Sequence, residues 1–448
     1  MARSMMPAPG DWNVANPDRP AWVLIRFDRQ TGNGVLLGDA AGAEAMAGTQ
    51  VCLFGGRSKA LLTRRPGQPA RMGAMTEPPQ TLSLDERRRL AMLGVERNLM
   101  GRHPVSPQDE LRSIIAELDG SDDSTWDRYG DGGPVAALES QVATLLGKPA
   151  AVMFPSGIMA QQSTLRVWSD RLGSRRIAIP ALSHLLLHEQ DGPRLLNGFE
   201  WALLTTGVTT GGVVPTVDHL AAIPGELGAA LLEIPLRDGG YLLPSWEELE
   251  AFSRACSDRG VPLHLDGARI WESAPFLGHS PAEIAALADT VYVSFYKGLR
   301  GLAGAVVAGP EDIIAEVRLW RSRHGGTLWT MLPYAVSALR GLREELPRMT
   351  EYHARAVEMA ELLAAKGIRT FPARPHCNAF RIFVESPGDV ITERVVTVME
   401  REHLAVTPRW GDSEDVPGWS WTEFTVGSAT MEWSAQAAVD LLARVLLD

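Results

Sequence analysis

The stretch Leu263-His264-Leu265-Asp266-Gly267-Ala268-Arg269 decides the fold of this chain. Its apolar beginning predicts a strand over Pro262–Leu265, and the Asp-Gly pair that follows predicts a turn directly after the strand. His264 and Asp266 are two residues apart, so on a strand their side chains share one face, where we expect His264 to make a structural hydrogen bond. Open α/β sheets bind ligands at the carboxyl ends of their strands. The stretch therefore predicts an α/β protein with a ligand site beside Asp266.

Strand-like and helix-like segments alternate on both sides of this stretch. Helical segments such as Ser245–Arg259 and Pro281–Leu287 separate several of the strands, which favours a parallel sheet covered by helices. Most of the strands are apolar on both faces, as a sheet covered on both sides requires. The other predicted strands are Ala150–Phe154, Arg176–Ile179, Trp201–Leu204, Ala229–Ile234, Thr290–Ser294 and Gly304–Ala308.

The two ends of the chain differ from this centre. After a long helical region over Glu311–Leu346, alternating helices and strands up to Leu447 predict a smaller α+β domain. The first 75 residues contain Gly, Pro and Ala clusters without a sustained helical period, so an ordered and a poorly ordered extension are both open. We therefore divide the chain into an N-terminal extension (1–75), a large domain (76–345) and a small C-terminal domain (346–448).

Composition and charge exclude several classes of protein. The 448 residues carry 43 Lys+Arg and 54 Asp+Glu, and a net charge of -11 disfavours nucleic-acid binding. No apolar run is long enough to span a membrane, and no signal peptide is evident. The 3 cysteines are scattered, which argues against disulfides and fits a reducing cytoplasm. His184 and His188 have metal-ligand spacing without a third ligand motif, so we predict no metal site.

Two further segments complete a chemical pattern with Asp266. Val291–Gly298 places Lys297 just after another predicted strand, and Phe154–Gly157 forms a strand-to-helix turn with free N–H groups. Pyridoxal 5'-phosphate (PLP) requires these three features together: a lysine for the Schiff base, an acid that keeps the pyridine nitrogen protonated, and an anchor for the phosphate. The order of the segments therefore predicts a PLP site.

The motifs that surround these segments resemble those of the threonine aldolase/β-eliminating lyase family. The resemblance is strong over residues 100–345, loose in the C-terminal domain, and absent from the first 75 residues. It implies a PLP enzyme of fold type I, whose large domain has a mostly parallel seven-stranded sheet covered by helices. The motifs are Tyr129-Gly130-Asp131-Gly132, Phe154–Gln161, Ser183-His184, His264–Arg269, Ser294–Leu299 and His324-Gly325-Gly326.

The resemblance also implies roles for single residues. Lys297 would form the Schiff base and Asp266 would pair with the pyridinium nitrogen. His184 would stack on the ring near the β-carbon of the substrate, either as a group that assists proton transfer or as a stacking residue only. These three residues are the candidate catalytic groups.

Four more residues would complete the cofactor site. Ser156 and Gly157 would hold the phosphate, and Arg269 would lie beside the phenolic oxygen of PLP. Tyr129 would reach the cofactor across a subunit interface, because the sites of this family lie between the subunits of dimers or tetramers. The protein is therefore expected to be a homodimer or a homotetramer.

Several positions depart from the family pattern. Ile158 replaces a threonine of the phosphate loop, Trp329 replaces an arginine, and the loop 233–240 lacks the histidine that many members have there. Glu423 stands where an arginine usually binds the substrate carboxylate. Arg381 and Arg409 are alternatives for that charge, although neither position matches the motif.

The function implied by this resemblance is that of a PLP-dependent lyase. It would cleave or form the Cα–Cβ bond of a β-hydroxy-α-amino acid, giving glycine and an aldehyde, with a small amino acid as its substrate. Two alternatives are open: a β-eliminating lyase or amino-acid racemase on the same scaffold, and a catalytically idle binding protein that keeps the fold.

Overall fold

The computed structural model describes residues 82–119, 125–205, 213–414 and 416–447, together with four short strands nearer the N-terminus. The chain forms two compact units, Met1–Leu82 and Ser83–Asp448. In the first unit, two antiparallel strand pairs are described: β1 (Ile25–Phe27) with β2 (Gly34–Leu36), and β3 (Val51–Cys52) with β4 (Leu61–Leu62). The division of the chain at residues 75 and 345 stays a prediction.

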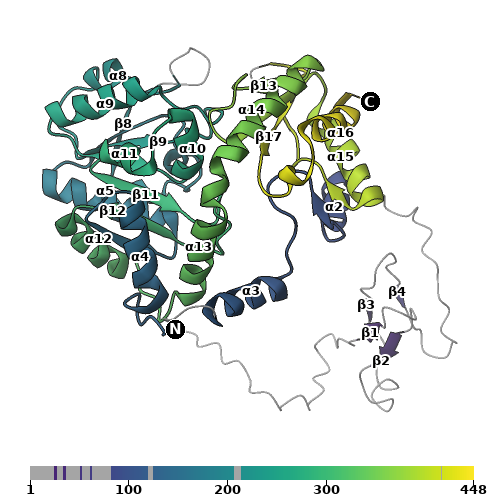
Figure 1. Ribbon diagram of the computed structural model, residues 1–448, viewed down its shortest axis with the longest axis horizontal. Helices are drawn as coiled ribbons and strands as arrows, with labels where there is room; N and C mark the ends of the chain where they lie inside the picture. The colour runs from purple at the N-terminus through teal and green to yellow at the C-terminus, as the bar shows by residue number, and fades with distance from the viewer. Residues whose placement is uncertain are drawn as a thin grey trace. The chain divides into compact units, whose positions relative to one another are not determined.

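A seven-stranded sheet forms the centre of the second unit, in the order β6-β12-β11-β10-β9-β7-β8. Only β12 runs antiparallel to its neighbours, so the mostly parallel sheet that the sequence predicts is confirmed (Figure 1). Its strands are β6 (Ala150–Phe154), β7 (Arg176–Ile179), β8 (Glu200–Leu203), β9 (Ala229–Glu233), β10 (Leu263–Asp266), β11 (Thr290–Ser294) and β12 (Ala305–Gly309).

Helices cover both faces of this sheet because alternate strand residues point into two separate cores. Val291 and Val293 of β11 belong to one apolar cluster, whereas Tyr292 between them belongs to the other. The helices of this part are α4 (Gly133–Leu145), α5 (Gly157–Leu172), α6 (His184–Leu187), α7 (Gly192–Asn197), α8 (Val217–Ala221), α9 (Trp246–Asp258), α10 (Ile270–Leu277), α11 (Pro281–Ala286), α12 (Glu311–Arg323) and α13 (Leu332–Glu344).

The long helical region expected over Glu311–Leu346 is interrupted. Gly325 adopts a left-handed conformation with φ of 76°, which ends α12. The carboxylate of Asp127 then accepts the backbone N–H of Met331 at 3.0 Å and fixes the start of α13. Two helices therefore replace the single helical region.

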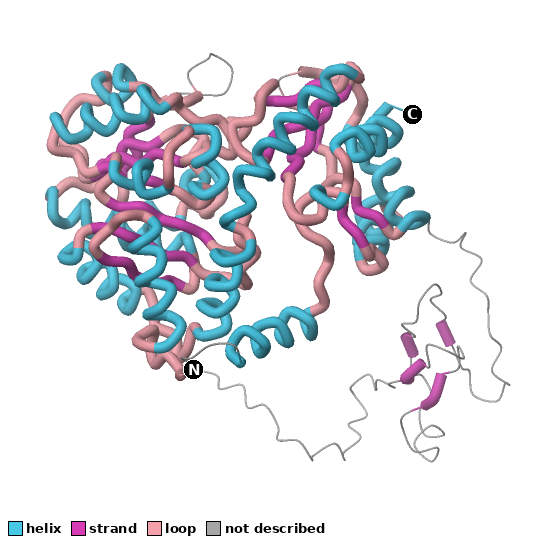
Figure 2. Tube along the Cα trace, viewed as in Figure 1, coloured by secondary structure: helices cyan, strands magenta, loops and turns pink. Residues whose placement is uncertain are grey.

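An antiparallel sheet in the order β13-β14-β17-β16 forms the C-terminal part, with helices packed against it (Figure 2). The early segment α2–β5 also belongs here, because α2 packs on α15 and β5 pairs in parallel with β15. The elements are α2 (Leu84–Met92), β5 (Arg97–Asn98), α14 (Met349–Ala365), β13 (Arg369–Phe371), β14 (Ala379–Val384), α15 (Gly388–Glu402), β15 (Leu404–Ala405), β16 (Gly411–Asp412), β17 (Ser420–Thr425) and α16 (Ala435–Leu447). Helix α3 (Pro107–Asp119), which follows β5, packs instead on α13.

Local hydrogen bonds fix the positions of several elements. Ser83 and Glu86 form the capping box at the start of α2, and equivalent boxes start α9 and α11. His264 is fully buried, and its Nδ1 lies 2.9 Å from Thr290 Oγ1, which is the structural hydrogen bond expected of it. In the part of the chain that the structure describes, no helix is long and apolar enough to cross a membrane.

Candidate active site

Three neighbouring strands bring charged groups to one edge of the large sheet. Asp266 is the last residue of β10 and lies opposite Glu233, the last residue of β9. Lys297 follows the end of β11 in the next turn. Because these strands are parallel and adjacent, their carboxyl ends meet, as the sequence predicts for Asp266 and Lys297.

A cavity of about 190 Å³ opens at this edge, and we call it the strand-end cavity. Five of the seven predicted site residues line it: Ser156, Gly157, His184, Asp266 and Lys297. The structure thus brings together predicted site residues from four separate segments of the chain. Sequence reasoning missed four further residues of its wall that have polar side chains, which are Gln161, Glu189, Tyr292 and Tyr296.

The carboxylate of Asp266 is buried and held in one orientation. Its Oδ2 accepts a hydrogen bond from Gln161 Nε2 at 2.8 Å, and its Oδ1 accepts the backbone N–H of Ala268 at 3.1 Å. Gln161 comes from the first turns of α5, so this helix both reaches the cavity with its N-terminus and fixes the acid.

The N-terminus of α5 is available to bind an anion. Its N-cap residue Ser156 makes no side-chain capping hydrogen bond, and the first intrahelical donor is the N–H of Ala160. The preceding N–H groups therefore point out of the helix end, where the helix dipole favours negative charge. Gly157 is required here, because a Cβ atom at this position would lie 2.1 Å from Tyr292 Oη.

Lys297 lies in the wall between two cavities, since it lines the strand-end cavity and a second one described below. Burial lowers the pKa of its amine, whereas the nearby Asp266 carboxylate opposes this shift. The turn after Lys297 packs tightly, because a Cβ atom on Gly298 would lie 2.2 Å from Glu272 Oε1. The turn that carries Lys297 therefore packs directly against the side chain of Glu272.

His184 starts helix α6 and is fixed at two points. Its ring Nδ1 lies 2.9 Å from Oε1 of the largely buried Glu189, and its backbone N–H donates to Glu233 Oε2 at 2.7 Å. The hydrogen bond to Glu189 raises the pKa of His184 above its ordinary value. The neighbouring His188 pairs with a different carboxylate, Asp238, at 2.8 Å.

Glu233 is a buried carboxyl group that the sequence analysis did not single out. It also accepts the backbone N–H of Arg237 at 3.1 Å, so it ties the loop after β9 to helix α6. Burial, and then the negative charge of Asp266, raise the pKa of Glu233. The position of Glu233 at a strand end, one strand from Asp266, is the signal that could have identified it.

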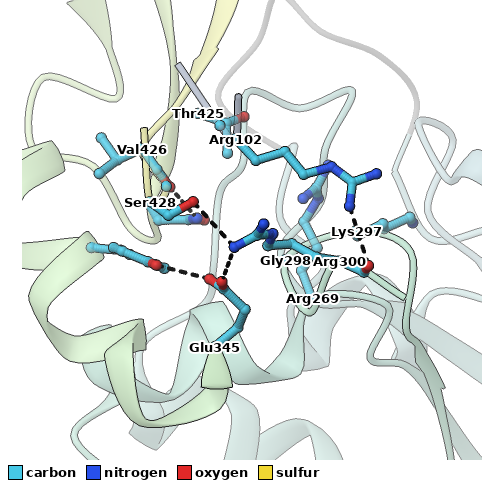
Figure 3. A pocket seen from close by; sticks show the side chains of 13 residues that line it. Arg102, Arg269, Lys297, Gly298, Arg300, Glu345, Thr425, Val426 and Ser428 are labelled. Atoms are coloured by element: carbon cyan, nitrogen blue, oxygen red, sulfur yellow. Dashed lines mark hydrogen bonds and ion pairs between the residues drawn. The ribbon is translucent and has the colours of Figure 1, made fainter. Parts of the chain in front are cut away.

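A second cavity of about 220 Å³ lies on the other side of Lys297, and we call it the arginine cavity (Figure 3). Its cationic groups are Lys297, Arg102, Arg269 and Arg300. Arg269, the sixth predicted site residue, is the N-cap of α10 and lies 3.7 Å from Glu272. Four cationic side chains therefore line this cavity, together with the carboxylate of Glu345.

The remaining candidates lie elsewhere. Tyr129 is 52% exposed and contacts Trp329 edge-on, with 5.0 Å between ring centroids. Glu423 forms an ion pair with Arg237 at 2.8 Å. Among the described residues that line the two cavities, neither Arg381 nor Arg409 is present. Arg381 stacks on Trp421, and Arg409 pairs with Asp85 and Asp389 on the surface.

Comparisons with known proteins agree with this geometry. Residues 106–386 match the family described as β-eliminating lyase. The chain is 27% identical over 307 residues to low-specificity L-threonine aldolase 1 of Arabidopsis thaliana, which covers 66% of this chain and 84% of the relative.

Two solved structures are similar to this one over nearly their whole length. A candidate L-allo-threonine aldolase from Listeria monocytogenes superimposes with a TM-score of 0.74 at 35% identity, covering 81% of this chain and 99% of that chain. A candidate aromatic amino acid β-eliminating lyase/threonine aldolase from Exiguobacterium sp. 255-15 gives a TM-score of 0.73 at 36% identity, with coverage of 80% and 99%.

Proposed function

The chain belongs to the β-eliminating lyase family, and we propose that it is a PLP-dependent lyase that cleaves the Cα–Cβ bond of a β-hydroxy-α-amino acid. The products are glycine and an aldehyde, as in a threonine aldolase reaction. One observation carries this proposal: Lys297, Asp266 and the uncapped N-terminus of α5 line a single cavity.

PLP fits the residues of the strand-end cavity. When bound, it supplies an electron-withdrawing ring that stabilises the carbanion left when a bond to Cα breaks. Lys297 would hold it covalently, and Asp266 would keep its ring nitrogen protonated. The N–H groups of α5, together with Ser156 and Gly157, would bind its phosphate, and Arg269 would approach its phenolic oxygen.

The environment of Lys297 suits its proposed role. Only the neutral amine is a nucleophile, and burial shifts its protonation equilibrium toward that form. The orientation of Asp266 suits its role equally well, because Gln161 and the N–H of Ala268 hold the carboxylate in place before any ligand arrives. The chain therefore prepares both groups in advance.

His184 is the proposed base for the aldol cleavage. With Nδ1 donating to Glu189, the neutral ring carries its free electron pair on Nε2. That nitrogen would accept the proton of the β-hydroxyl group as the aldehyde leaves, and Glu189 would stabilise the imidazolium that forms. If His184 only stacked on the ring, its pairing with Glu189 would have no effect on the pH dependence of the reaction.

A second copy of the chain would complete the site. The chain exposes the aromatic side chain of Tyr296 at the wall of the strand-end cavity, and those of Tyr129 and Trp329 elsewhere on its surface. We therefore propose a homodimer or a homotetramer in which Tyr129 reaches the site of its partner. The buried free thiols of Cys256 and Cys377 support a cytoplasmic location.

An assay of the purified protein with PLP tests the proposed function. Threonine and allo-threonine should each be tested for release of glycine and acetaldehyde, with serine and both enantiomers of alanine as comparison substrates. Aldehyde and glycine are expected. Pyruvate and ammonia from serine would replace the proposal by β-elimination, inversion of alanine would replace it by racemisation, and no reaction would favour an idle binding protein.

A further inference from the structure

The arginine cavity is lined by Arg102, a cation that has no role in the chemistry proposed above. We propose that Arg102 binds the α-carboxylate of the amino-acid substrate in this cavity. The inference rests on the proposed function, because it assumes that the substrate amine reacts at Lys297. It goes further by naming the group that selects an α-amino acid over a simple amine.

The position of the cavity fits this role. The carboxylate carbon of an amino acid is two bonds from its amino nitrogen, so its anion must lie close to the point where that nitrogen is bound. Lys297 marks this point, and it lines the strand-end cavity on one side and the arginine cavity on the other. A substrate held at Lys297 can therefore place its carboxylate in the arginine cavity, beside Arg102.

The charges of the cavity single out Arg102. The guanidinium of Arg300 is already paired with Glu345 at 2.5 Å and also donates to Ser428 Oγ at 3.3 Å (Figure 3). Arg269 has the buried carboxyl group of Glu272 as a neighbour at 3.7 Å.

Arg102 has no such partner among the described residues. Its side chain makes one hydrogen bond, to the backbone oxygen of Arg300 at 3.3 Å, and no ion pair with a carboxylate (Figure 3). A guanidinium has five N–H donors in a planar fork that matches the geometry of a carboxylate. Arg102 is exposed to solvent and lines the arginine cavity, so it has both unused donors and an uncompensated charge at the cavity wall.

The backbone holds Arg102 at the end of β17. The N–H of Gly101 donates to Thr425 O at 2.8 Å, and Gly101 O accepts the N–H of Ala429 at 3.0 Å. The contact is so close that a Cβ atom on Gly427 would lie 2.5 Å from Gly101 O. The segment that carries Arg102 is therefore fixed against the last strand of the C-terminal sheet.

This placement accounts for the absence of an arginine on β17 itself. Glu423 occupies the position where the family resemblance places an arginine, and it is paired with Arg237. The cation instead comes from the segment that packs against Thr425 and Gly427 of the same stretch. The positive charge is thus supplied by a different part of the chain.

Spectroscopic titration of the PLP-loaded protein tests this inference. Glycine and glycinamide both carry the amine, but only glycine carries the carboxylate. For Arg102→Gln, the affinity for glycine should fall about 10- to 100-fold, the loss expected for a charge-assisted hydrogen-bonded pair, while the affinity for glycinamide stays within about twofold. Arg102→Lys should give an intermediate loss for glycine, because it keeps the charge and loses the fork.

Arg409→Gln is the matched control, since it removes an exposed arginine outside both cavities and should change neither affinity. The thermal unfolding temperature and the absorption spectrum without amino acid should be the same in all variants. Equal losses for glycine and glycinamide, or an unchanged affinity for glycine in Arg102→Gln, would overturn the inference. A parent protein that binds neither ligand and cleaves no substrate would refute the proposed function itself, and this inference with it.

Discussion

The two cavities that meet at Lys297 are built in different ways. The strand-end cavity is formed by strand ends and by the helix starts that follow them, so its polar groups belong to compact sequence motifs. The arginine cavity takes its wall from distant segments, including Arg102, the turn around Arg300, Glu345 at the end of α13, and the end of β17. One cavity is a product of local turns, the other of tertiary packing.

Because the two cavities are built in different ways, we expect them to have different roles in the reaction. In the strand-end cavity, the sheet register fixes the side chains at the ends of adjacent parallel strands. These side chains form the proposed PLP site. Groups delivered by the C-terminal part can change without disturbing the sheet, as the pairing of Glu423 with Arg237 illustrates. We therefore expect the strand-end cavity to determine the type of chemistry and the arginine cavity to determine the choice of substrate.

Removal of the Lys297 amine, which lines both cavities, should have the largest effect on the rate of cleavage. Lys297→Ala removes the only proposed covalent anchor, so the rate of aldol cleavage should fall on the order of 10⁴-fold or more. Borohydride reduction followed by peptide mapping should label the peptide that contains Lys297 in the parent protein and leave the variant unlabelled.

Lys366→Ala is the control for that experiment, because Lys366 lies on the surface and pairs with Asp440. Its cleavage rate and its labelled peptide should match those of the parent. An adduct that persisted at another lysine in Lys297→Ala would show that the two cavities do not meet at the reactive amine, and the comparison between them would lose its basis.

The strand-end cavity could be predicted from the sequence to a large extent. The turns after β6, β10 and β11 each follow a short apolar strand, and a parallel sheet must bring such turns together. Gln161 and Glu189 were missed as functional residues because their roles depend on a partner in space, Asp266 for one and His184 for the other. Neither partner can be read from local spacing.

The arginine cavity could not be predicted in the same way. Arg102 and Thr425 are far apart in the chain, and the contact between their segments arises from the backbone hydrogen bonds around Gly101 and Gly427. Arg381 and Arg409 were the alternatives for the charge that Glu423 replaces, although neither position matches the family motif. The structure shows that neither lines the described cavities.

Gly157→Ala should damage the strand-end cavity alone. The added methyl group would lie 2.1 Å from Tyr292 Oη, so we expect a loss of about 1–3 kcal/mol in the free energy of unfolding and weaker retention of PLP. Chemical denaturation and dialysis against buffer without PLP would measure these effects. The preference of the reloaded protein for glycine over glycinamide should remain, because the arginine cavity is unchanged.

Gly411→Ala provides the reference for this prediction. An added Cβ at Gly411 meets nothing within 4 Å, so its free energy of unfolding should stay within about 0.5 kcal/mol of the parent. If Gly157→Ala also lost the discrimination between glycine and glycinamide, a change in the strand-end cavity would alter binding in the arginine cavity. The two cavities would then not be independent.

The smallest effect is expected from Glu189→Gln, which changes the electrostatics of one wall of the strand-end cavity. The hydrogen bond to Glu189 raises the pKa of His184, so its loss should move the acidic limb of the pH–rate profile to lower pH. Because the pKa of His184 is higher in the folded protein, the pair stabilises the fold below the unfolded value of about 6.5, and this contribution disappears as pH rises through the folded pKa.

The difference in the free energy of unfolding between Glu189→Gln and the parent should therefore be largest below pH of about 6.5 and remain below about 1 kcal/mol, since His184 is partly exposed. Asp238→Asn is the matched variant, because it removes the carboxylate of the neighbouring His188. His188 is absent from the described cavity wall, so the pH–rate profile of Asp238→Asn should follow the parent. A profile that stayed in place for Glu189→Gln as well would assign His184 to stacking alone and leave the proton of the β-hydroxyl group to another base.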